Sequence, residues 1–317
     1  MGAYLAKRLA ASVVTAILSS LVVFWLVRQV PGDVVAQMLG QSGARGSAAE
    51  ASLRRFFGLD EPLWRQYLAW VWAVLQGDLG TSWVRGRPVL DMVVAAFMVT
   101  LQLGLMTLAF ATLIGVPLGL IAGLYEGRRI DNAIQAFNLL GLSAPVFWLG
   151  LILLMAVSQT LAWSPPLVFR SPGRDLGQNL QILILPLLSL GILQAAAYSQ
   201  FTRQCVVSAF SQDYVRTAVA KGLPMRVVFF KHILRNILIP LVTFMGLILI
   251  QILGGTVVIE TLFALPGLGR LLISAIETRD YPVVQGALLF VVFTALVVNL
   301  AVDMLYHVID PRVRVGG

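Results

Sequence analysis

Side chains that could act as nucleophiles, metal ligands or acid–base groups are few in this sequence. Its 317 residues include two histidines, His232 and His307, and neither has carboxylate or cysteine partners at the spacing of a metal site. The one cysteine, Cys205, has no second cysteine with which to form an internal disulfide and lacks the companions of a redox or metal site. We therefore predict neither a zinc centre nor a serine–histidine active site, and we interpret Cys205 as a small apolar residue.

Phosphate-binding chemistry is missing as well. The sequence contains no G-x-x-x-x-G-K-[ST] phosphate loop, and its three lysines, Lys7, Lys221 and Lys231, do not follow a glycine-rich turn. The chain is therefore not expected to hydrolyse ATP by itself in that way.

Composition identifies the elements that must hold the remaining polar groups. Hydrophobic residues make up 58% of the chain and charged residues 12%, which is typical of an integral membrane protein. The formal charge of +8 comes from Lys and Arg spread among short loops, which the positive-inside rule explains better than nucleic-acid binding. Six segments are long and apolar enough to cross a bilayer, and we predict an all-α fold with six transmembrane helices at residues 9–30, 96–124, 133–162, 181–202, 237–262 and 283–309.

The distribution of Lys and Arg predicts the orientation. One side of the predicted membrane holds Lys7, Arg8, Arg128, Arg129, Arg203, Arg216, Lys221, Arg226, Lys231, Arg235, Arg312 and Arg314. The other side holds Arg170, Arg174, Arg270 and Arg279 in its short loops. The first side is expected to be cytoplasmic, with both termini on it. The first span follows Lys7 and Arg8, but its apolar stretch is too long for a secretory signal and no small-residue cleavage site follows, so we expect it to stay as an anchor.

Polar groups at membrane depth are mostly neutral. A transporter driven by protons or sodium usually keeps ionisable groups there, but Arg28, Glu260 and Asp303 lie near predicted span ends, where snorkelling or loop contacts satisfy them. The deeper polar side chains are Gln102, Gln159, Gln194, Gln251 and Asn299. Each of them either joins two helices by a hydrogen bond or contacts a substrate. A transport path lined by neutral groups, in a chain without an ATP-binding motif, implies that the energy for transport comes from another protein.

The segment between the first two spans has its own organisation. The stretch "GQSGARGSAAE" is typical of a flexible connector, and the following "LDEPLWRQYLAWVWAVLQGDLG" predicts a helix opened by Asp60 and Pro62 and closed near Gly77. Its aromatic residues are Trp64, Tyr67, Trp70 and Trp72. They suit either an amphipathic helix at the outer membrane surface or a platform on which a substrate stacks.

A short helix is predicted between the fourth and fifth spans, in the stretch "DYVRTAVAKGLP". Asp213 is expected to cap it, Lys221 to lie in its last turn and Gly222 to end it. One predicted face carries Tyr214, Val215, Ala218 and Val219, and the other carries Arg216, Thr217, Ala220 and Lys221. A helix of about eight residues is marginal alone in water, so it either lies on lipid headgroups or docks on a soluble partner.

This stretch, continued as "MRVVFFKHILRNILIP", resembles the cytoplasmic EAA loop of bacterial ABC-importer permeases of the dipeptide, oligopeptide and nickel family. Other pieces resemble the first permease subunit of that family in order and spacing: "FGLDEPLWRQYLAW", "GDLGTSW", "TLQLG", "SAPVFWLG", "GGTVVIETLFALPGLGRLLISAIETRDYPVVQG" and "DPRVR". The general importer pattern has Glu-Ala-Ala where this chain has Arg216, Thr217 and Ala218. Any contact that depends on the glutamate is therefore in doubt.

The resemblance implies a type I ABC-importer permease fold in a bacterial cytoplasmic (inner) membrane, with both termini cytoplasmic. Its expected parts are residues 1–30, the cytoplasmic N-terminus and first span; 31–95, an extracytoplasmic segment with an interfacial helix; 96–309, a five-helix core; and 310–317, a cytoplasmic tail. The core includes a coupling loop at residues 203–235 and an external loop at residues 263–282. The implied partners are a homologous second permease, two P-loop ATPases that bind ATP and Mg, an extracytoplasmic substrate-binding protein and membrane lipid, whereas this chain is expected to bind no cofactor and no metal itself.

The resemblance also implies roles for particular residues. The helix that couples to the ATPase comprises Asp213, Tyr214, Arg216, Thr217, Ala218, Lys221 and Gly222. The external gate and the docking site of the binding protein would involve Gly254, Gly255, Glu260, Pro266, Gly267, Gly269, Arg279 and Asp280. Gly254 and Gly255 are either a packing notch or a hinge, and Arg279 and Asp280 either pair with each other or contact the binding protein. Gln102, Ser143, Gln194 and Gln251 are predicted to line the path.

The predicted function is that of a non-enzymatic permease subunit forming half of the path for ATP-driven uptake of di- or oligopeptides. Nickel complexes, glutathione and opines are alternative substrates within the same family. A stand-alone ion-coupled secondary transporter is the contrasting class, and its transport would collapse with the ion gradient. A membrane-embedded enzyme would need a polar catalytic cluster at depth, which the sequence does not contain.

Overall fold

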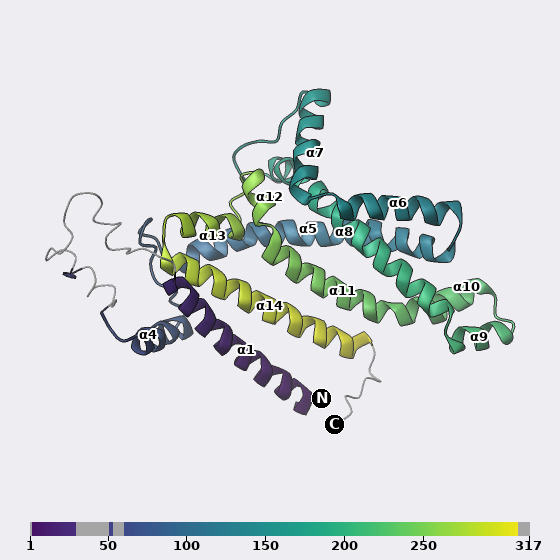
Figure 1. Ribbon diagram of the computed structural model, residues 1–317, viewed down its shortest axis with the longest axis horizontal. Coiled ribbons are helices and arrows are strands. Elements are labelled where there is room, and N and C mark those ends of the chain that lie inside the picture. The colour runs from purple at the N-terminus through teal and green to yellow at the C-terminus, as the bar shows by residue number, and fades with distance from the viewer. Residues whose placement is uncertain (1, 30–50, 53–59, 310–317) are drawn as a thin grey trace. The chain divides into compact units, whose positions relative to one another are not determined.

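A computed structural model describes residues 2–29, 51–52 and 60–309. Within this part of the chain every named element is a helix, and the one strand-like pairing is an isolated bridge between Thr81 and Pro88 (Figure 1). The elements are α1 (Gly2–Gln29), α4 (Leu63–Leu75), α5 (Val89–Leu124), α6 (Arg129–Ser143), α7 (Val146–Leu161), α8 (Leu176–Phe210), α9 (Asp213–Ala220), α10 (Met225–Val227), the π-helix η1 (Val228–Ile233), α11 (Leu234–Gly255), α12 (Val257–Leu262), α13 (Leu268–Glu277) and α14 (Tyr281–Ile309). The predicted connector at residues 40–50 and the tail at residues 310–317, with Arg312 and Arg314, lie outside the described residues.

The membrane-spanning helices agree with the predicted all-α class. Five helical stretches of the described chain are long and apolar enough to cross a bilayer, and the number is six when the bent pair α6–α7 is counted as one span. A continuous helix at residues 133–162 is wrong, because α6 and α7 meet at an angle of 101°. Pro145 explains the break: it has no N–H to donate, and its ring forces Ala144 out of the helical region to φ −81°, ψ 127°.

The other spans are found where they were predicted, but they run further. The second begins at Val89 and not near residue 96, and the fourth covers Leu176–Phe210 and not residues 181–202. The start of α8 is fixed by Asp175, whose carboxylate accepts a hydrogen bond of 2.9 Å from the Gln178 N–H. The predicted fifth span at residues 237–262 is also displaced, because the helical stretch begins at Met225 and its long helix α11 ends at Gly255. Hydropathy marks the lipid-crossing part of a helix, whereas hydrogen bonding continues beyond it.

The chain divides into two compact units. The first comprises Met1–Phe97 and Leu271–Leu296, and the second comprises Met98–Arg270 and Val297–Gly317.

In the first unit, α4 packs on α1 through aromatic rings. Tyr67 lies edge-on to Phe24 with 5.4 Å between ring centroids, and Trp70 lies 6.0 Å from the same ring. Trp64 and Trp72 are 60% and 64% exposed. Two of the four aromatic residues predicted for the outer surface or a stacking platform are thus used for packing within the protein, and two are left outside. Beside them a cavity of about 440 Å³ is lined almost wholly by apolar side chains of α1, α4, α5 and α14.

In the second unit, α8 is the central helix and contacts α6, α7, α9, η1 and α11. A seam of three glycines on α5 lies directly against it. A Cβ added to Gly115 would lie 2.5 Å from the Ala195 carbonyl oxygen, and one added to Gly119 would lie 2.4 Å from the Ser199 carbonyl oxygen. Gly123 meets Val206 in the same way at 2.6 Å. The spacing of four residues brings the two backbones into contact, as small-xxx-small patterns do in membranes.

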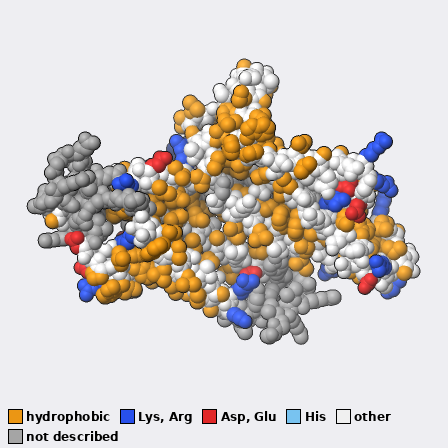
Figure 2. All heavy atoms as spheres, viewed as in Figure 1, with side chains coloured by type: hydrophobic (Ala, Val, Ile, Leu, Met, Phe, Trp, Pro, Cys, Tyr) orange, Lys and Arg blue, Asp and Glu red, His pale blue; other side chains and the backbone are white. Residues whose placement is uncertain are grey.

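Hydrophobic side chains cover most of the face drawn in Figure 2, as expected for a protein surrounded by lipid. Charged side chains gather in that view where α9 and α10 lie, beyond the end of α8. The loop that carries α9 is therefore one of the charged parts of this largely apolar face.

Candidate functional site: the α9 loop and the α12–α14 segment

The N-terminus of α9 differs from the prediction. Gln212 is the N-cap, with extended dihedral angles of φ −78° and ψ 147°, and no side chain caps the helix. Asp213 is therefore the first helical residue and not the cap. Its carboxylate is 97% exposed and lies 3.7 Å from the Arg216 guanidinium, an exposed pair that contributes little to stability. A negative charge in the first turn still interacts favourably with the helix dipole.

The C-terminus of α9 is closed as predicted by a left-handed glycine. Gly222 has φ +77°, and its N–H donates to the Val219 carbonyl at 2.9 Å. The Leu223 N–H donates to the Ala218 carbonyl at 3.3 Å, which completes a Schellman motif. Lys221 is the residue before this turn and lies just outside the helix. The chain thus leaves α9 in a direction that a side chain at Gly222 would oppose.

One edge of α9 is fixed to the core of the second unit. Val215 and Ala218 are 3% and 5% exposed, and they join an apolar cluster with residues of α8, η1 and α11. Tyr214 packs on the edge of this cluster, as predicted. Val219 was predicted on the same face as Val215 and Ala218, but it is 47% exposed and does not share their burial. The elements in closest contact with this helix are η1 and α8.

The rest of the loop forms an exposed surface that mixes charged and apolar groups. Ala218, predicted as part of a coupling surface, faces the protein's own core and is not on it. The exposed residues of α9 and of the chain that follows it, up to Met225, are Asp213, Arg216, Thr217, Val219, Ala220, Lys221, Gly222, Leu223, Pro224 and Met225. Large apolar side chains therefore lie beside charged ones on this surface.

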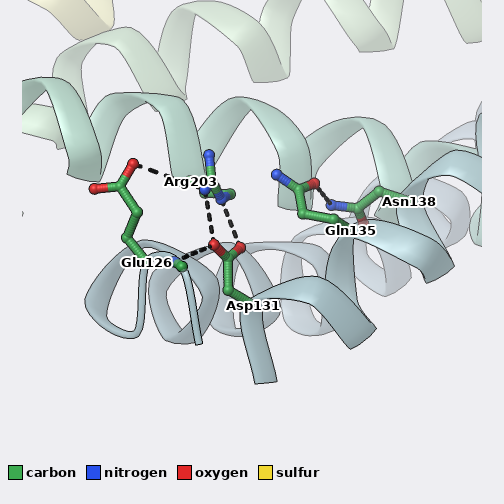
Figure 3. Close-up of polar contacts among 6 residues, drawn as sticks. Glu126, Asp131, Gln135, Asn138 and Arg203 are labelled. Atoms are coloured by element: carbon green, nitrogen blue, oxygen red, sulfur yellow. Dashed lines mark hydrogen bonds and ion pairs between the residues drawn. The ribbon is translucent and has the colours of Figure 1, made fainter. Parts of the chain in front are cut away.

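An ion pair joins the first turn of α6 to α8 (Figure 3). The Arg203 guanidinium donates two hydrogen bonds to Asp131, from Nε to Oδ1 at 2.7 Å and from Nη2 to Oδ2 at 2.8 Å. The Gly127 N–H donates to the same carboxylate at 2.9 Å, and Glu126 lies 3.8 Å from Arg203. Asp131 is 2% exposed and Arg203 is 19% exposed, so the carboxylate is shielded from water whereas the guanidinium is partly exposed. The sequence interpretation treated Arg203 as a loop cation and missed the pair.

Two amides further along α6 are drawn in the same view. The Asn138 side chain donates to the Gln135 side-chain oxygen at 3.1 Å, while the buried Asn138 Oδ1 accepts no hydrogen bond. The hydrogen bond between these amides lies within α6, whereas the Arg203–Asp131 pair joins α6 to α8.

Glu260, predicted at the external gate, lies inside the second unit. Its side chain is 0% exposed and accepts hydrogen bonds from the hydroxyls of Thr100 and Thr256. Gly267 and Gly269 pack directly against it, and Pro266 is exposed beside them. The acidic group therefore faces this local cluster and not the surface.

Asp280, in the first unit, also has partners that the sequence did not predict. Its carboxylate accepts hydrogen bonds from the Ser82 hydroxyl and, at 3.1 Å, from the Trp83 N–H, and it is 2% exposed. The alternative in which Arg279 pairs with Asp280 is therefore wrong. Arg279 is in the left-handed region at φ 54° and ends α13, with the Asp280 N–H donating to the Ala275 carbonyl at 2.8 Å. Side chains of adjacent residues in such a turn do not face each other.

The four residues predicted to line a path are in two kinds of environment. Gln102 is half-buried and donates to Asn179 Oδ1 at 2.6 Å, and Gln194 is buried. Ser143, at the break between α6 and α7, and Gln251, on α11, are exposed. Gly254 is exposed too, and a Cβ added there would meet no heavy atom within 4 Å. Gln102 thus joins α5 to α8, and the exposed polar groups remain candidates for the path.

The described residues contain no group of three or more His, Cys, Asp or Glu side chains that could hold a metal ion.

Comparison with known proteins identifies the family. Residues 115–315 match the family described as "Binding-protein-dependent transport system inner membrane component", and residues 1–104 match the corresponding N-terminal family of membrane components of binding-protein-dependent transport systems. The chain is 37% identical over 334 residues to the dipeptide transport system permease protein DppB of Escherichia coli K12, with 98% of both chains covered. It is 40% identical over 311 residues to the glutathione transport system permease protein GsiC of Escherichia coli O6:H1, again with 98% of both covered.

Solved structures show the same fold at low sequence identity. An inward-facing MetNI methionine ABC transporter matches with a TM-score of 0.50 and 18% identity, over 69% of this chain and 96% of that one. An amino acid ABC transporter crystallised with histidines matches with a TM-score of 0.50 and 13% identity, over 70% and 94%. The fold is thus that of type I ABC-transporter permeases.

Permeases of this kind are multi-pass inner-membrane subunits of a transporter complex, and they are not enzymes, because ATP hydrolysis takes place in partner ATPase subunits. The matched family description, the membrane-spanning helices and the two relatives that cover 98% of the chain all indicate such a permease. The chain belongs to the family of inner-membrane permease components of binding-protein-dependent ABC importers.

Proposed function

We propose that this chain forms half of the translocation path of an importer for di- or oligopeptides. The observation that carries the substrate class is the similarity, over 98% of the chain, to permeases named for dipeptide and glutathione transport. Both substrates are short peptides, so one path that accepts a peptide backbone would serve either. Glutathione is favoured as the second candidate by the 40% identity to GsiC, and nickel complexes and opines remain further alternatives.

The complex that we propose contains a homologous second permease, two P-loop ATPases and an extracytoplasmic substrate-binding protein. ATP and Mg would bind to the ATPases, since this sequence has no phosphate loop. We place the termini and the loop at residues 203–235 in the cytoplasm of a bacterium, and the segments at residues 31–95 and 263–282 on the outer side. The distribution of Lys and Arg among the short loops supports this orientation.

In this arrangement α9 is the element that docks on an ATPase. Asp213, Arg216, Thr217 and Lys221 would contact the cleft, and the half-buried Tyr214 would border it. Val215 and Ala218 would transmit movement, because they fix α9 to the core that also contains α8 and η1. Gly222 would set the exit direction, as its φ of +77° supports.

On the outer side, Pro266, Arg279 and neighbouring residues of the loop would lie near the docking site of the binding protein. Gln251 and Gly254 on the exposed side of α11, together with Ser143, would face the path or the second permease. Exposed polar groups in an apolar span are consistent with such a place, because lipid cannot satisfy them.

The test is to extract the chain gently from its native membrane and to identify by mass spectrometry what stays bound. Recovery of a second permease and P-loop ATPases, with ATP-dependent uptake of a labelled dipeptide after reconstitution, is expected. Competition by unlabelled glutathione would then decide between the two peptide substrates. A chain that transports without ATPases, and stops when the ion gradient is collapsed, would instead be a secondary transporter.

A further inference from the structure

We propose that Glu260 is a positioning residue: it anchors the first turn of α13 to α5 and α12 and so holds the segment that follows the fifth span in its transport-competent form. The effect on transport rests on the proposed function, whereas the anchoring itself does not. The family resemblance placed Glu260 at an external gate or docking surface, but its complete burial points to a different role.

The carboxylate of Glu260 joins three parts of the chain. Oε1 accepts hydrogen bonds from the Thr100 hydroxyl of α5 at 2.6 Å and from the Thr256 hydroxyl, just before α12, at 2.8 Å. Oε2 accepts from the Arg270 N–H in the first turn of α13 at 3.0 Å. The Thr100 hydroxyl oxygen in turn accepts from the Leu268 N–H at 2.8 Å. Two side chains from other helices therefore satisfy N–H groups that the start of α13 cannot satisfy internally.

A negative charge suits this place. Among the described residues no Lys, Arg or His side chain lies within ion-pair distance of Glu260, and the Arg270 guanidinium is directed instead to the Ala264 carbonyl. The charge of the carboxylate is balanced by three hydrogen-bond donors and by the positive end of the α13 dipole. Because each donor comes from a fixed element, the carboxylate is held in one place and so is the turn it binds.

The two glycines before and within this turn leave no room for a side chain, Gly267 because of the Glu260 carboxylate and Gly269 because of Val257. A Cβ added to Gly267 would lie 2.3 Å from Glu260 Cδ, and its next nearest neighbours are the two carboxylate oxygens. A Cβ added to Gly269 would lie 2.6 Å from Val257 Cγ2 and 2.8 Å from the Val257 Cα. The stretch "ALPGLGR" is thus shaped to close over Glu260, with one glycine facing the carboxylate and the other facing backbone.

Glu260→Gln tests the anchor with nearly unchanged volume. The amide oxygen can still accept from the two threonine hydroxyls, but the NH2 group then faces the Arg270 N–H, so α13 loses one acceptor. In the purified complex reconstituted in lipid, hydrogen exchange of the backbone amides in α13 should become at least ten times faster, while the buried part of α8 should not change. ATP-driven uptake should fall by a similar factor. Glu277→Gln, an exposed substitution in the same helix, is the matched control for hydrogen exchange and should leave exchange in α13 unchanged.

A second set of variants tests the geometry by compensation. Gly267→Ala alone should abolish most uptake, because its Cβ collides with the carboxylate. Combined with Glu260→Ala, the same substitution should cost no further activity, since the colliding atoms are gone. Gly269→Ala should remain harmful in both backgrounds, because the Val257 backbone stays where it is.

Hydrogen exchange keeps the two proposals distinguishable. Faster exchange in α13 for Glu260→Gln, with compensation between Gly267→Ala and Glu260→Ala in the yield of folded complex, supports the anchor even if the complex transports no peptide. Exchange in Glu260→Gln equal to that of the unchanged chain, or additive losses in the double variant, would overturn it.

Discussion

Replacing Arg203 by alanine should be among the most destabilising single changes in the second unit. The substitution removes both hydrogen bonds to Asp131, at 2.7 and 2.8 Å, and leaves the Gly127 N–H as the remaining donor to that carboxylate. Asp131 is 2% exposed, so after the substitution water would reach its carboxylate only through the space vacated by the Arg203 side chain.

The magnitude follows from the asymmetry of buried pairs. Removing one member of a buried ion pair costs about 3–5 kcal/mol, because the other charge is left uncompensated. Arg203 is 19% exposed and one backbone donor remains, so we expect the lower end, about 3 kcal/mol. Removing Asp131 as well takes away the stranded charge, and the double variant should therefore be less destabilised than the sum of the single variants by about 1–3 kcal/mol.

The assay is a double-mutant cycle of Arg203→Ala and Asp131→Ala, measured as the apparent free energy of unfolding of the purified protein in mixed micelles. The stability of Arg203→Lys should lie between that of the unchanged protein and that of Arg203→Ala, because an ammonium group keeps the charge but cannot form the bidentate pair. Arg129→Ala, an exposed arginine in the first turn of α6, is the control and should change stability by less than about 0.5 kcal/mol. Arg203→Ala as stable as the control, or additive single changes, would show that the pair does not hold α6 to α8.

Three further predictions follow from backbone geometry. Gly222→Val should leave the complex assembled but abolish ATP-driven uptake, because a β-branched residue resists the φ of +77°. Gly222→Asn, the control, should retain uptake, because asparagine tolerates the left-handed region. Normal uptake by the valine variant would refute the proposed exit of α9. Gly119→Ala should lower the free energy of unfolding by about 1–3 kcal/mol, because its Cβ would lie 2.4 Å from the Ser199 carbonyl oxygen. Gly254→Ala, whose Cβ would have no heavy atom within 4 Å, is the control and should be tolerated. Equal effects of the two substitutions in a thermal unfolding assay would contradict the close packing of α5 on α8. Asp280→Ala should lower the free energy of unfolding by about 1–3 kcal/mol, because it removes the carboxylate to which the Ser82 hydroxyl and the Trp83 N–H donate. Arg279→Gly should be neutral or stabilising, because Arg279 has a φ of 54°. Equal losses of unfolding free energy in the two variants would favour the Arg279–Asp280 pair.

Local chemistry made some features predictable from the sequence. Apolar length predicted the spans, and the glycine after a short amphipathic run predicted the left-handed turn at Gly222. Pro145 also indicates a break in the helix, because a residue before proline avoids the helical region. The apolar sequence on both sides of Pro145 nevertheless led to the prediction of one continuous span. The four-residue spacing of Gly115, Gly119 and Gly123 is a further sequence pattern typical of closely packed helices.

Contacts between distant residues could not be read in the same way. Asp131 and Arg203 are 72 positions apart, and Ser82 and Asp280 are 198 apart. One sequence contains no information about which of several acidic residues meets which donor. Glu260 was assigned to a span end because a carboxylate in an apolar segment is usually satisfied at the surface. Its burial depends on two threonines and a helix start that only the folded chain brings together.

The two short helices that we associate with partner proteins are held by different forces, and this difference bears on how they can move. The α9 helix is fixed by the apolar side chains of Val215 and Ala218, and apolar contact is non-directional, so a small rotation or shift keeps most of it. The first turn of α13 is fixed by hydrogen bonds to Glu260 and Thr100, which weaken steeply when the angle or distance changes. We therefore expect α9 to adjust to its partner while staying attached, and the start of α13 either to move together with α5 and α12 or to detach from them. The forces that hold each helix make α9 suited to following a partner's motion and the start of α13 suited to keeping a fixed shape.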